Sequence, residues 1–369
     1  MIRVCHIISG DLWAGAEVVD YHLLKNLKKN EDIELSAILF NEGKLANEIR
    51  SIGIPVDVLD ERKRNFLQLV RDAGKIVIQR SPDIIHSHRY KENILAFLSS
   101  KYKSGIRLVS TQHGMPEYIG TEPDKKYMLL QKLNSTLLSK SFRKVITVSN
   151  EMQRVFINRY GFPENKIAVI HNGTDIINKP TVKRDREVFI IGSMGRIFPV
   201  KDFSLMVEIA REVCKEEDKI RFELAGDGPD REKIIDLIER YRLGNFFLLN
   251  GFVENLFNFY ENIDLYLNTS LHEGIPMSIL EAMSYEIPIV APNVGGMKEI
   301  LNDGIEGYLV DGRDPKVFAD KCLKLYKDKL LRQSMGFSAK EKVQNEFSNE
   351  RMAREYFGLY SDIMGEAHA

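Results

Sequence analysis

The chain has 369 residues, of which 44% are hydrophobic and 28% charged, and this composition excludes a disordered or fibrous protein. The formal net charge is −1, but residues 1–180 carry 27 Lys and Arg against 20 Asp and Glu, whereas the remainder carries 25 against 33. The basic first half favours an anionic partner. Its basic and aromatic side chains are too sparse for a nucleic-acid surface, so no nucleic-acid partner is expected.

The sequence indicates neither a membrane span nor a disulfide framework. No apolar run approaches the roughly 20 residues that a helix needs to cross a bilayer, and the short apolar start is typical of a strand rather than a signal peptide. Three cysteines, Cys5, Cys214 and Cys322, are far apart and have no paired spacing. These features predict a protein of the reducing cytoplasm.

Short β-rich runs alternate with amphipathic stretches in the first half of the chain. This alternation predicts parallel strands joined by crossover helices. The predicted strands are Arg3–Ser9, Glu34–Phe40, Val56–Leu59, Ile84–His86, Arg107–Thr111, Val145–Val148 and Ile167–Ile170.

A polar, proline-containing stretch from Asp175 to Glu187 interrupts the alternation and predicts a linker near residue 180. The pattern then restarts, which predicts a second doubly wound domain. The tail from Phe347 to Ala369 is expected to be helical, and it could complete the second domain or cross back to the first. The second set of predicted strands is Val188–Met194, Ile220–Ala225, Phe246–Asn250, Leu265–Leu267, Pro288–Ala291 and Gly307–Leu309.

Two carboxylates eight residues apart, Glu273 and Glu281, form the most informative motif. Pro276 lies between them; it excludes a helix through the first part of the segment and suits the first turn of a helix. The motif therefore predicts Glu273 on a loop, a helix starting near Pro276, and Glu281 about one turn inside it. Carboxylates beside free backbone N–H groups suit a polyol attached to an anion, and a nucleotide sugar is such a molecule.

Three glycine-containing loops follow predicted strands, where parallel sheets bind ligands. In the first, Gly10 and Gly15 lack the third glycine of a dinucleotide fingerprint, so this loop either approaches a ligand or is an ordinary tight turn. In the second, Arg196 and Lys201 could converge on a phosphate or be solvated surface cations, and the strand-end glycine before them favours the phosphate. In the third, Gly226 and Gly228 allow close backbone approach, although the same sequence would also make an ordinary turn between a strand and a helix.

Histidines at predicted strand ends are further candidates. His113 follows a strand, and a single histidine is more often a structural hydrogen-bonding residue than a catalytic one. His86 and His88 are two residues apart, but no nearby carboxylate or cysteine completes a ligand set. A metal site is therefore disfavoured.

Five motifs resemble, in the expected order, those of the retaining glycosyltransferases of family 4, which have the GT-B fold. The resemblance runs from the first strand to at least Val310. It implies an α/β protein with two doubly wound, Rossmann-like domains facing a central cleft: 1–175 on the acceptor side, 176–346 on the donor side, and a C-terminal helix at 347–369. The motifs are Glu273-Gly-Ile-Pro-Met-Ser-Ile-Leu-Glu281, Gly195-Arg196 with Lys201, Thr111-Gln-His-Gly114, Asn172-Gly-Thr-Asp175 and Gly15-Ala-Glu17.

The resemblance implies roles for these residues. Glu281 would accept hydrogen bonds from the ribose hydroxyls, and Arg196 with Lys201 would neutralise the diphosphate as it leaves. Glu273 would hold a hydroxyl of the transferred sugar, and His113 would face that sugar from the other domain. The expected catalytic residues are thus Glu273, Arg196, Lys201 and His113.

Other residues are implied around the donor and the acceptor. Gly15 would let its loop approach the diphosphate and sugar, although Ala14 stands where the family often has another glycine and narrows the freedom of that loop. Asn172 and Glu17 are expected on the sugar or acceptor side, and backbone near Val253 would contact the base. The remaining expected donor-binding residues are Gly274, Ile275, Pro276, Met277, Ser278, Gly195 and Gly226.

The implied reaction moves a hexosyl unit from a nucleotide-diphosphate sugar to a hydroxyl acceptor with retention. Fixed cations and a helix N-terminus would stabilise the departing phosphate. No acidic pair suggests a required metal, so no metal or other cofactor is expected, and the nucleotide sugar is a substrate. A uridine nucleotide is favoured because it is common. A hinge near residue 180 is expected to close over the donor.

The acceptor is expected to be a sugar or a lipid-linked molecule of cell-surface polysaccharide or glycoconjugate synthesis. Residues 124–144 predict a helix with leucines on one side and basic residues elsewhere. This helix could rest on an anionic membrane, which would make the protein peripheral at the inner face, or it could be a packed helix with a solvated basic face. The oligomeric state is not predicted.

Other classes of protein share the predicted fold. A nucleotide-sugar epimerase would invert a hydroxyl-bearing carbon of the free nucleotide sugar, whereas a transferase would leave that carbon unchanged. A non-catalytic nucleotide-sugar-binding protein is a second alternative, and the intact set of Glu273, Glu281, Arg196 and Lys201 argues against it. The missing glycine fingerprint disfavours a nicotinamide dehydrogenase.

Overall fold

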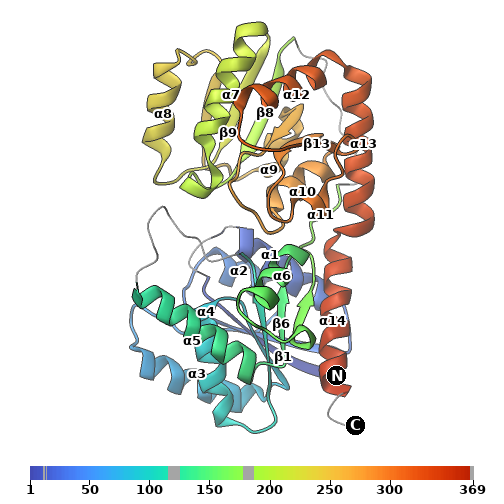
Figure 1. The fold of residues 1–369 in the computed structure, drawn as a ribbon. Helices are drawn as coiled ribbons and strands as arrows, with labels where there is room; N and C mark the ends of the chain where they lie inside the picture. Colours follow the sequence, from blue (N-terminus) through green and yellow to red (C-terminus); the bar gives the residue numbers. More distant parts are fainter. Residues whose placement is uncertain (11–12, 14, 115–124, 178–186, 366–369) are drawn as a thin grey trace. The chain divides into compact units, whose positions relative to one another are not determined.

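The computed structural model describes residues 1–10, 13, 15–114, 125–177 and 187–365, without the side chains of residues 125–129. The chain forms two compact units (Figure 1). One comprises Met1–Gly173 together with the segment from Asn349 onward, and the other comprises Thr174–Ser348. The predicted linker and hinge near residue 180 lie outside the described residues.

The first unit is built on a seven-stranded parallel sheet with the order β3-β2-β1-β4-β5-β6-β7. Strands covered by helices on both faces are nearly continuous apolar runs. In β1, every residue from Val4 to Ile8 is buried. The strands are β1 (Ile2–Ile8), β2 (Ile33–Leu39), β3 (Val56–Val58), β4 (Ile84–Ser87), β5 (Arg107–Gln112), β6 (Lys144–Thr147) and β7 (Ile167–Val169).

Helices connect these strands, with short 3₁₀ turns at Ser100–Tyr102 and Glu164–Lys166. One helix start shows the local logic: the side chain of Asn65 accepts from the N–H of Gln68, whose side chain accepts from the N–H of Asn65. The helices are α1 (Gly15–Leu27), α2 (Lys44–Ser51), α3 (Phe66–Arg80), α4 (Tyr90–Ser99), α5 (Lys125–Ser141), α6 (Asn150–Asn158) and α14 (Asn349–Gly365).

The last helix, α14, packs against α1 and belongs to the first unit. The hydroxyl of Tyr360 lies 2.6 Å from Nδ1 of His86. The hydroxyl of Tyr356 lies 2.9 Å from Oγ1 of Thr111. Both tyrosines are buried, so the tail supplies part of the interior of the first unit.

The second unit is built on a six-stranded parallel sheet with the order β10-β9-β8-β11-β12-β13. Its hydrophobic core includes Phe222, Leu265 and Phe318. The strands are β8 (Phe189–Met194), β9 (Ile220–Ala225), β10 (Phe247–Gly251), β11 (Leu265–Leu267), β12 (Ile289–Pro292) and β13 (Gly307–Val310).

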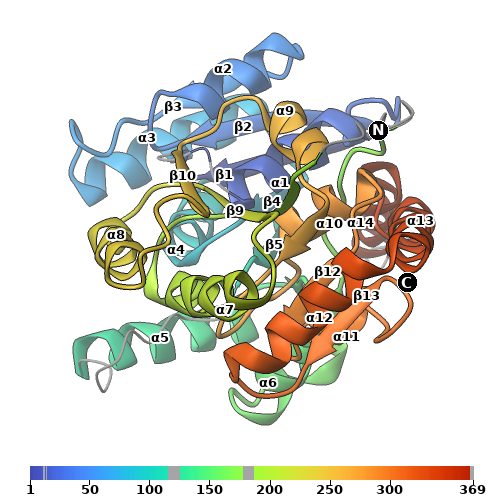
Figure 2. The same cartoon turned by 90° about the horizontal axis from the view of Figure 1, so that it is seen from above.

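Helices flank this sheet as well, and α7 and α12 pack side by side (Figure 2). A 3₁₀ turn at Pro199–Lys201 leads into α7. The helices are α7 (Phe203–Glu216), α8 (Arg231–Arg240), α9 (Leu256–Asn262), α10 (Met277–Ser284), α11 (Met297–Ile300), α12 (Pro315–Lys327) and α13 (Lys329–Glu346). Each predicted strand corresponds, in order, to a strand of the described chain, and the predicted class of two doubly wound α/β sheets is confirmed.

The predicted basic helix at 124–144 corresponds to α5, and residues 124–129 lie outside the described side chains. Leu138 and Phe142 are buried and Leu137 packs against the core, whereas Leu133 is exposed. The apolar side of α5 is therefore largely part of the core, which favours the packed-helix alternative. No helix in the described ranges is both long and apolar enough to cross a bilayer.

Candidate active site

The two sheets each have one place where the strand order changes direction. This switch point lies between β8 and β11 in the second unit and between β1 and β4 in the first. Open parallel sheets bind ligands beyond the carboxyl ends of their strands at such points. The expected donor residues of the second unit lie on the loops that follow β8, β9, β10 and β11 and on α10, while Gly15 begins α1 and His113 follows β5.

An ion pair joins the β8 and β11 loops across the switch point of the second unit. Nζ of Lys201 lies 2.5 Å from Oε1 of Glu273, which also accepts from the hydroxyl of Ser270 at 2.6 Å. The side chains of Lys201 and Glu273 are 25% and 11% exposed. The structure thus brings together two of the predicted catalytic residues, with Lys201 facing Glu273.

The helix after Glu273 begins where the sequence predicts. Pro276 is the N-cap of α10, and Met277 is its first residue. Ile275 is buried like Pro276 and Met277, while Ser278 is partly buried. The free N–H groups of the first turn point out of the helix end, which favours an anion there.

Glu281 lies in the second turn of α10 and is held by Tyr260 of α9. The hydroxyl of Tyr260 lies 2.6 Å from Oε2 of Glu281. Burial raises the pKa of Glu281 to about 7, and the hydrogen bond from Tyr260 opposes this rise. The carboxyl is therefore divided between its neutral and charged forms near neutral pH, and a ligand that donates hydroxyl hydrogens to it would favour the charged form.

Arg196 packs on Phe198 and takes no part in the Lys201–Glu273 ion pair. It is exposed, and its guanidinium carbon lies 5.0 Å from the ring centre of Phe198. Convergence of Arg196 and Lys201 on one anion stays a prediction. Val253 is partly buried in the turn after β10, and its contact with a base also stays a prediction.

Glycines let the loops of the second unit pack backbone against backbone. A Cβ on Gly226 would lie 1.9 Å from the carbonyl oxygen of Gly195, and one on Gly296 would lie 2.1 Å from that of Gly274. The N–H of Gly226 donates to Gly251 at 2.7 Å. The close approach expected at Gly226 is therefore made to a neighbouring loop of the same unit.

In the first unit, α1 carries two of the predicted residues. Gly15 is its first residue, and Ala14 lies outside the described residues. Oε1 of Glu17 lies 2.5 Å from Nη2 of Arg89, and the Glu17 side chain is 2% exposed. Burial raises the pKa of Glu17, and Arg89 opposes this rise. Glu17 thus serves an internal ion pair, while Asn172 is buried after β7.

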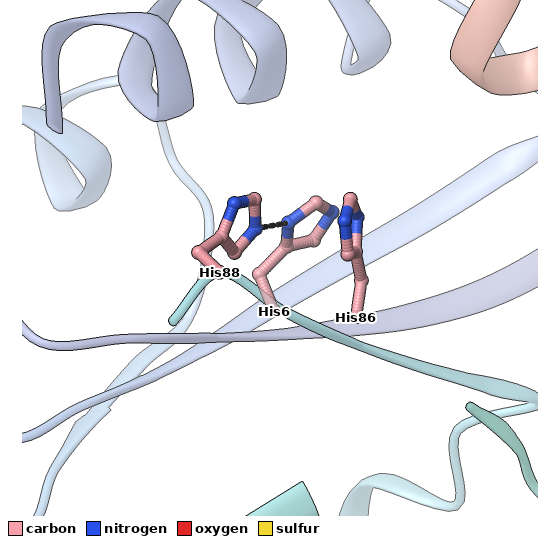
Figure 3. A group of neighbouring side chains, drawn as sticks. All are labelled: His6, His86 and His88. Carbon is pink, nitrogen blue, oxygen red and sulfur yellow. Dashed lines mark hydrogen bonds between the residues drawn. The ribbon is translucent and has the colours of Figure 1, made fainter. Parts of the chain in front are cut away.

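Three histidines from β1 and the end of β4, His6, His86 and His88, meet at the switch point of the first unit (Figure 3). Nδ1 of His6 lies 3.0 Å from Nε2 of His88. Burial lowers the pKa of His6 to about 3, and it lowers the pKa of His88 against the opposing charge of Asp20. Nε2 of His86 lies 2.8 Å from Oγ1 of Thr111.

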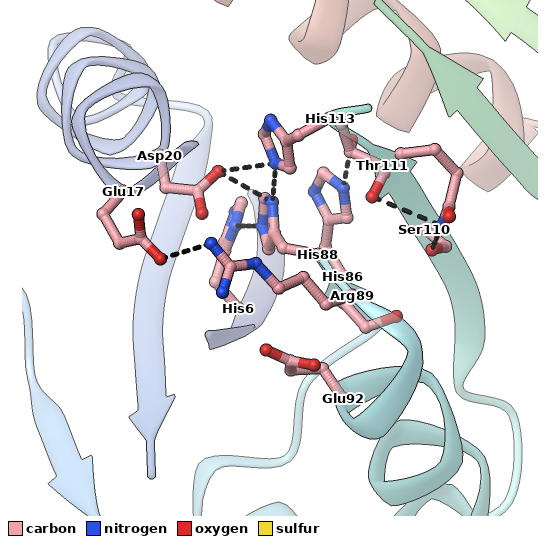
Figure 4. A network of polar contacts seen from close by, with 12 residues as sticks. His6, Glu17, Asp20, His86, His88, Arg89, Glu92, Ser110, Thr111 and His113 are labelled. Carbon is pink, nitrogen blue, oxygen red and sulfur yellow. Dashed lines mark hydrogen bonds and ion pairs between the residues drawn. The ribbon is translucent and has the colours of Figure 1, made fainter. Parts of the chain in front are cut away.

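Asp20 of α1 connects His88 with His113 (Figure 4). Its Oδ1 lies 2.8 Å from Nδ1 of His88 and 3.2 Å from Nε2 of His113. Burial alone would raise the pKa of Asp20, but the two histidines hold it below its usual range. Asp20 is therefore charged at neutral pH.

Two groups of described residues could hold a metal ion: His6 with His86 and His88, and Asp20 with His88 and His113. The prediction that no carboxylate lies near His88 was wrong, because the pairing of β1 with β4 brings α1 and Asp20 beside it. In the first group both nitrogens of His86 already face the hydroxyls of Tyr360 and Thr111.

Several residues of these networks carry no motif in the sequence. Tyr260 and Ser270 hold the two carboxylates, and Arg313 donates to the carbonyls of Thr269 and Ser270 at 2.6 and 3.0 Å. Asp20 lies three residues after Glu17, so the two side chains lie on the same face of α1. This spacing is the one sequence signal that could have identified Asp20 as a candidate.

Two family models match the chain. The model for glycosyltransferase family 4 matches residues 13–177, and the model for group 1 glycosyl transferases matches residues 175–342. Together they account for most of the chain, including all strands of both sheets except β1. The protein belongs to the group 1 glycosyltransferases of family 4 and is a retaining glycosyltransferase.

Among its relatives is the Escherichia coli UDP-Gal:α-D-GlcNAc-diphosphoundecaprenol α-1,3-galactosyltransferase, which is 25% identical over 98% of this chain and 97% of its own. The poly(ribitol-phosphate) α-N-acetylglucosaminyltransferase of Staphylococcus aureus is 30% identical over 58% of this chain and 43% of its own. The capsular polysaccharide biosynthesis glycosyltransferase CapM of Staphylococcus aureus is 23% identical over 83% and 92%.

Solved structures share the fold over nearly the whole chain. The Anabaena protein HepE in complex with UDP and glucose superimposes with a TM-score of 0.84 at 20% identity, covering 98% of this chain and all of that one. TarM of S. aureus in a complex that contains UDP gives a TM-score of 0.79 at 16% identity, with coverage of 98% and 100%. At these identities the likeness shows the fold.

Proposed function

We propose that the protein transfers a hexosyl unit from a UDP-sugar to a hydroxyl acceptor in cell-surface polysaccharide or glycoconjugate synthesis. The E. coli relative, matched over nearly the full length of both chains, is named for a UDP-Gal donor and a lipid-diphosphate-linked acceptor. A second relative is named for capsular polysaccharide synthesis. These names support a UDP donor and a lipid-linked acceptor, and with such an acceptor the enzyme would work in the cytoplasm at the inner face of the membrane.

One observation carries the proposal: a carboxylate–ammonium pair stands at the switch point beside the N-terminus of α10. Lys201 and Glu273 come from the loops on either side of the switch point, and Glu281 lies one turn inside α10. In the proposed complex Glu281 accepts from the ribose hydroxyls, and Glu273 holds a sugar hydroxyl. Arg196, Lys201 and the N–H groups of α10 stabilise the diphosphate.

The proposed reaction needs no covalent intermediate on the protein. The bond between the anomeric carbon and the β-phosphate oxygen breaks, and the acceptor oxygen bonds to that carbon on the same face. The acceptor proton passes to a phosphate oxygen, and the nucleoside diphosphate leaves. Positive charge from Lys201 and Arg196 stabilises the negative charge that develops on the leaving group.

The first test is a thermal-shift and turnover panel with UDP-, GDP- and ADP-sugars. We expect a UDP-sugar to stabilise the wild type selectively and to release UDP slowly to water. Glu281→Gln and Arg196→Ala should lose the stabilisation. The exposed α8 residues offer matched controls, Glu232→Gln and Arg240→Ala, which should respond like the wild type.

The outcomes separate the possible donors and classes. Selective stabilisation by a GDP- or ADP-sugar would contradict the UDP assignment. Stabilisation that survives both site variants would contradict the site. If the wild type inverted a carbon of the free nucleotide sugar, seen by NMR of the sugar protons, the transferase proposal would fail in favour of epimerisation.

A further inference from the structure

The turn between β13 and α12 sets the backbone position of Arg313. Gly312, which precedes it, has a φ of 78°, a left-handed conformation that glycine adopts without strain. Asp314, which follows it, is the N-cap of α12 and accepts from the N–H of Lys316 at 3.0 Å. Pro315 then begins the helix, where its fixed φ suits the backbone. The side chain of Arg313 therefore extends from an ordered turn.

The guanidinium of Arg313 joins the β8 and β11 loops of the second unit. Because β12 lies between β13 and β11 in the sheet, this side chain reaches past one strand. Its Nη2 donates to the carboxylate of Asp202 at the end of the β8 loop. On the β11 loop it donates to the carbonyls of Thr269 at 2.6 Å and of Ser270 at 3.0 Å. These contacts with Asp202, Thr269 and Ser270 are called the Arg313 bridge below.

Asp202 is unusual both in its backbone and in the use of its side chain. Its φ of 44° and ψ of 51° are left-handed, which is uncommon for residues other than glycine. It is the N-cap of α7, where an aspartate commonly accepts from the first turn, but its side chain makes no such bond. The carboxylate is directed to Arg313 instead. The ion pair thus supports the turn that directly follows Lys201.

Two further hydrogen bonds cross from the β11 loop to the backbone around Lys201. The hydroxyl of Thr269 donates to the carbonyl of Lys201 at 2.9 Å. The N–H of Leu271 donates to the carbonyl of Val200 at 2.8 Å. The backbone on both sides of the Lys201 side chain is therefore tied either to the β11 loop or, through Asp202, to Arg313.

The other end of the Arg313 bridge is connected with Glu273. The carbonyl of Ser270 accepts from Arg313, while the hydroxyl of the same residue donates to Oε1 of Glu273 at 2.6 Å. That oxygen is also the one that pairs with Nζ of Lys201. Ser270 is buried, so its backbone and side chain have little freedom. Both members of the Lys201–Glu273 pair thus depend on residues that Arg313 contacts.

We propose that Arg313 is a positioning residue that joins the β8 and β11 loops and thereby holds the Lys201 ammonium beside Glu273, where it meets the diphosphate of the donor. This inference rests on the proposed function, in which Lys201 stabilises the diphosphate. Arg313 acts through its neighbours: the two hydrogens of Nη2 serve Asp202 and Thr269. It therefore has a role in donor binding without a contact with the donor.

Two other roles for Arg313 predict different behaviour of variants. If Arg313 were a direct ligand of the diphosphate, Asp202→Gly would free its guanidinium, and nucleotide binding would be kept or improved. If it only supplied positive charge, Arg313→Lys would bind like the wild type. A positioning residue needs both its carboxylate partner and its planar fork, because the compact ammonium of lysine does not present donors to both loops in the same geometry.

The first experiment measures the joining of the loops without a ligand. Native-state hydrogen exchange at the N–H of Leu271 reports the opening of the bond between the loops. We expect Arg313→Lys and Asp202→Gly each to speed this exchange about tenfold, the effect of weakening a charged hydrogen bond. The N–H of Tyr266, which bonds within the sheet, should keep its rate. Glycine accepts the left-handed φ at position 202, so that variant keeps its backbone.

Two variants of the same unit are matched controls. Arg240→Lys makes the same change at an exposed position of α8. Arg242→Gly removes a side chain at another left-handed position, with a φ of 57°, outside both loops. Neither control should change exchange at Leu271 or the affinity for nucleotides.

The second experiment compares UDP with UMP, which has the same base and ribose but one phosphate fewer. By titration calorimetry we expect Arg313→Lys and Asp202→Gly each to weaken UDP binding about tenfold, while UMP binding changes less than about twofold. The double variant should bind UDP no more weakly than either single variant, because the two residues act through one ion pair. A general loosening of the unit would weaken the binding of both nucleotides alike.

Four results would overturn the inference. They are unchanged exchange at Leu271 in both variants, wild-type UDP affinity in Arg313→Lys, wild-type or higher UDP affinity in Asp202→Gly, and equal losses of UDP and UMP affinity. A wild type that does not bind UDP would overturn the proposed uridine donor, while exchange at Leu271 would still test the Arg313 bridge. Thermal unfolding of each variant identifies any loss that comes from misfolding.

Discussion

Glu281 illustrates how one residue couples the site to pH. Its pKa in the folded protein is about 7, above the 4.5 of an exposed glutamate, so the unfolded state releases this proton first as the pH rises. Folding stability from this group is therefore lost between about pH 4.5 and 7 and stays lost above. We expect Glu281→Gln to raise the free energy of unfolding of the ligand-free protein on the order of 2 kcal/mol at pH 8, an amount reduced for partial solvent exposure.

Urea unfolding at pH 5 and pH 8 checks this prediction. The increase in the free energy of unfolding caused by Glu281→Gln should be clearly smaller at pH 5, because less of the Glu281 carboxyl is ionised there in both the folded and the unfolded state. An equal gain at both pH values would mean that the amide stabilises α10 for another reason. Glu232→Gln on the exposed face of α8 provides the control and should change neither value.

The Lys201–Glu273 pair makes a second prediction at the residue scale. Lys201→Met removes the ammonium and leaves a partly buried carboxylate, which should cost about 1–2 kcal/mol of stability. Combining it with Glu273→Gln should recover part of that loss, because no unpaired charge remains. The measurement is a double-mutant cycle by urea unfolding. Simple addition of the two single losses would show that the pair is not coupled.

Single residues also show the limit of sequence reasoning. The pair Glu273 and Glu281 was recognisable because Pro276 sets the helix start and so the placement of each carboxylate. The partner of Glu281 was not, because Tyr260 lies on another helix and carries no motif. Tertiary packing determines such partners, and the spacing of residues within one element carries no information about contacts between elements.

At the scale of elements, the strands could be predicted from the sequence, whereas the contacts between loops could not. The strands were predictable because buried parallel strands are continuous apolar runs bounded by turns. The contact between the β8 and β9 loops could not be predicted, because it depends on the backbone torsion of one residue. Gly226 has a φ of 143° and lies against Gly195. In the structure the missing Cβ of Gly226 makes room for the backbone of Gly195, and contact of Gly226 with the donor stays a prediction.

This packing predicts a clear contrast between two glycines. Gly226→Ala would place a Cβ 1.9 Å from a carbonyl oxygen, so the β8 loop must shift. We expect a loss of about 2–4 kcal/mol of stability and weaker donor binding, because Arg196 and Lys201 are on that loop. Gly244→Ala, with no atom within 4 Å of the new Cβ, should change neither. Calorimetric unfolding and donor titration test both, and equal effects would reject the steric argument.

At the scale of the whole molecule, the chain leaves the first unit at Gly173 and returns to it at Asn349. The second unit is a continuous segment whose ends meet, because the N–H of Thr174 donates to the carbonyl of Phe347 at 2.8 Å. The periodicity of the tail could not reveal the return of α14, since its destination depends on the fit of Tyr356 and Tyr360 to Thr111 and His86.

The two units should therefore behave differently as fragments. A fragment of residues 174–348 contains a complete sheet and core, and we expect it to unfold cooperatively. A fragment of residues 1–173 lacks α14 and should show a poorly dispersed NMR spectrum until a peptide of residues 349–369 is added. A well-dispersed spectrum of 1–173 alone, unchanged by the peptide, would show that α14 is dispensable for the first unit.

The position of α14 in the sequence also delays completion of the first unit during synthesis on the ribosome. After residue 173 is made, about 190 more residues must follow before the helix that closes the first sheet emerges, roughly 10–40 s at ordinary translation rates. The second unit can fold during this interval, whereas the first waits with the sides of His86 and Thr111 uncovered. The nascent first unit is thus the species that needs protection by chaperones, and the emergence of α14 ends that need.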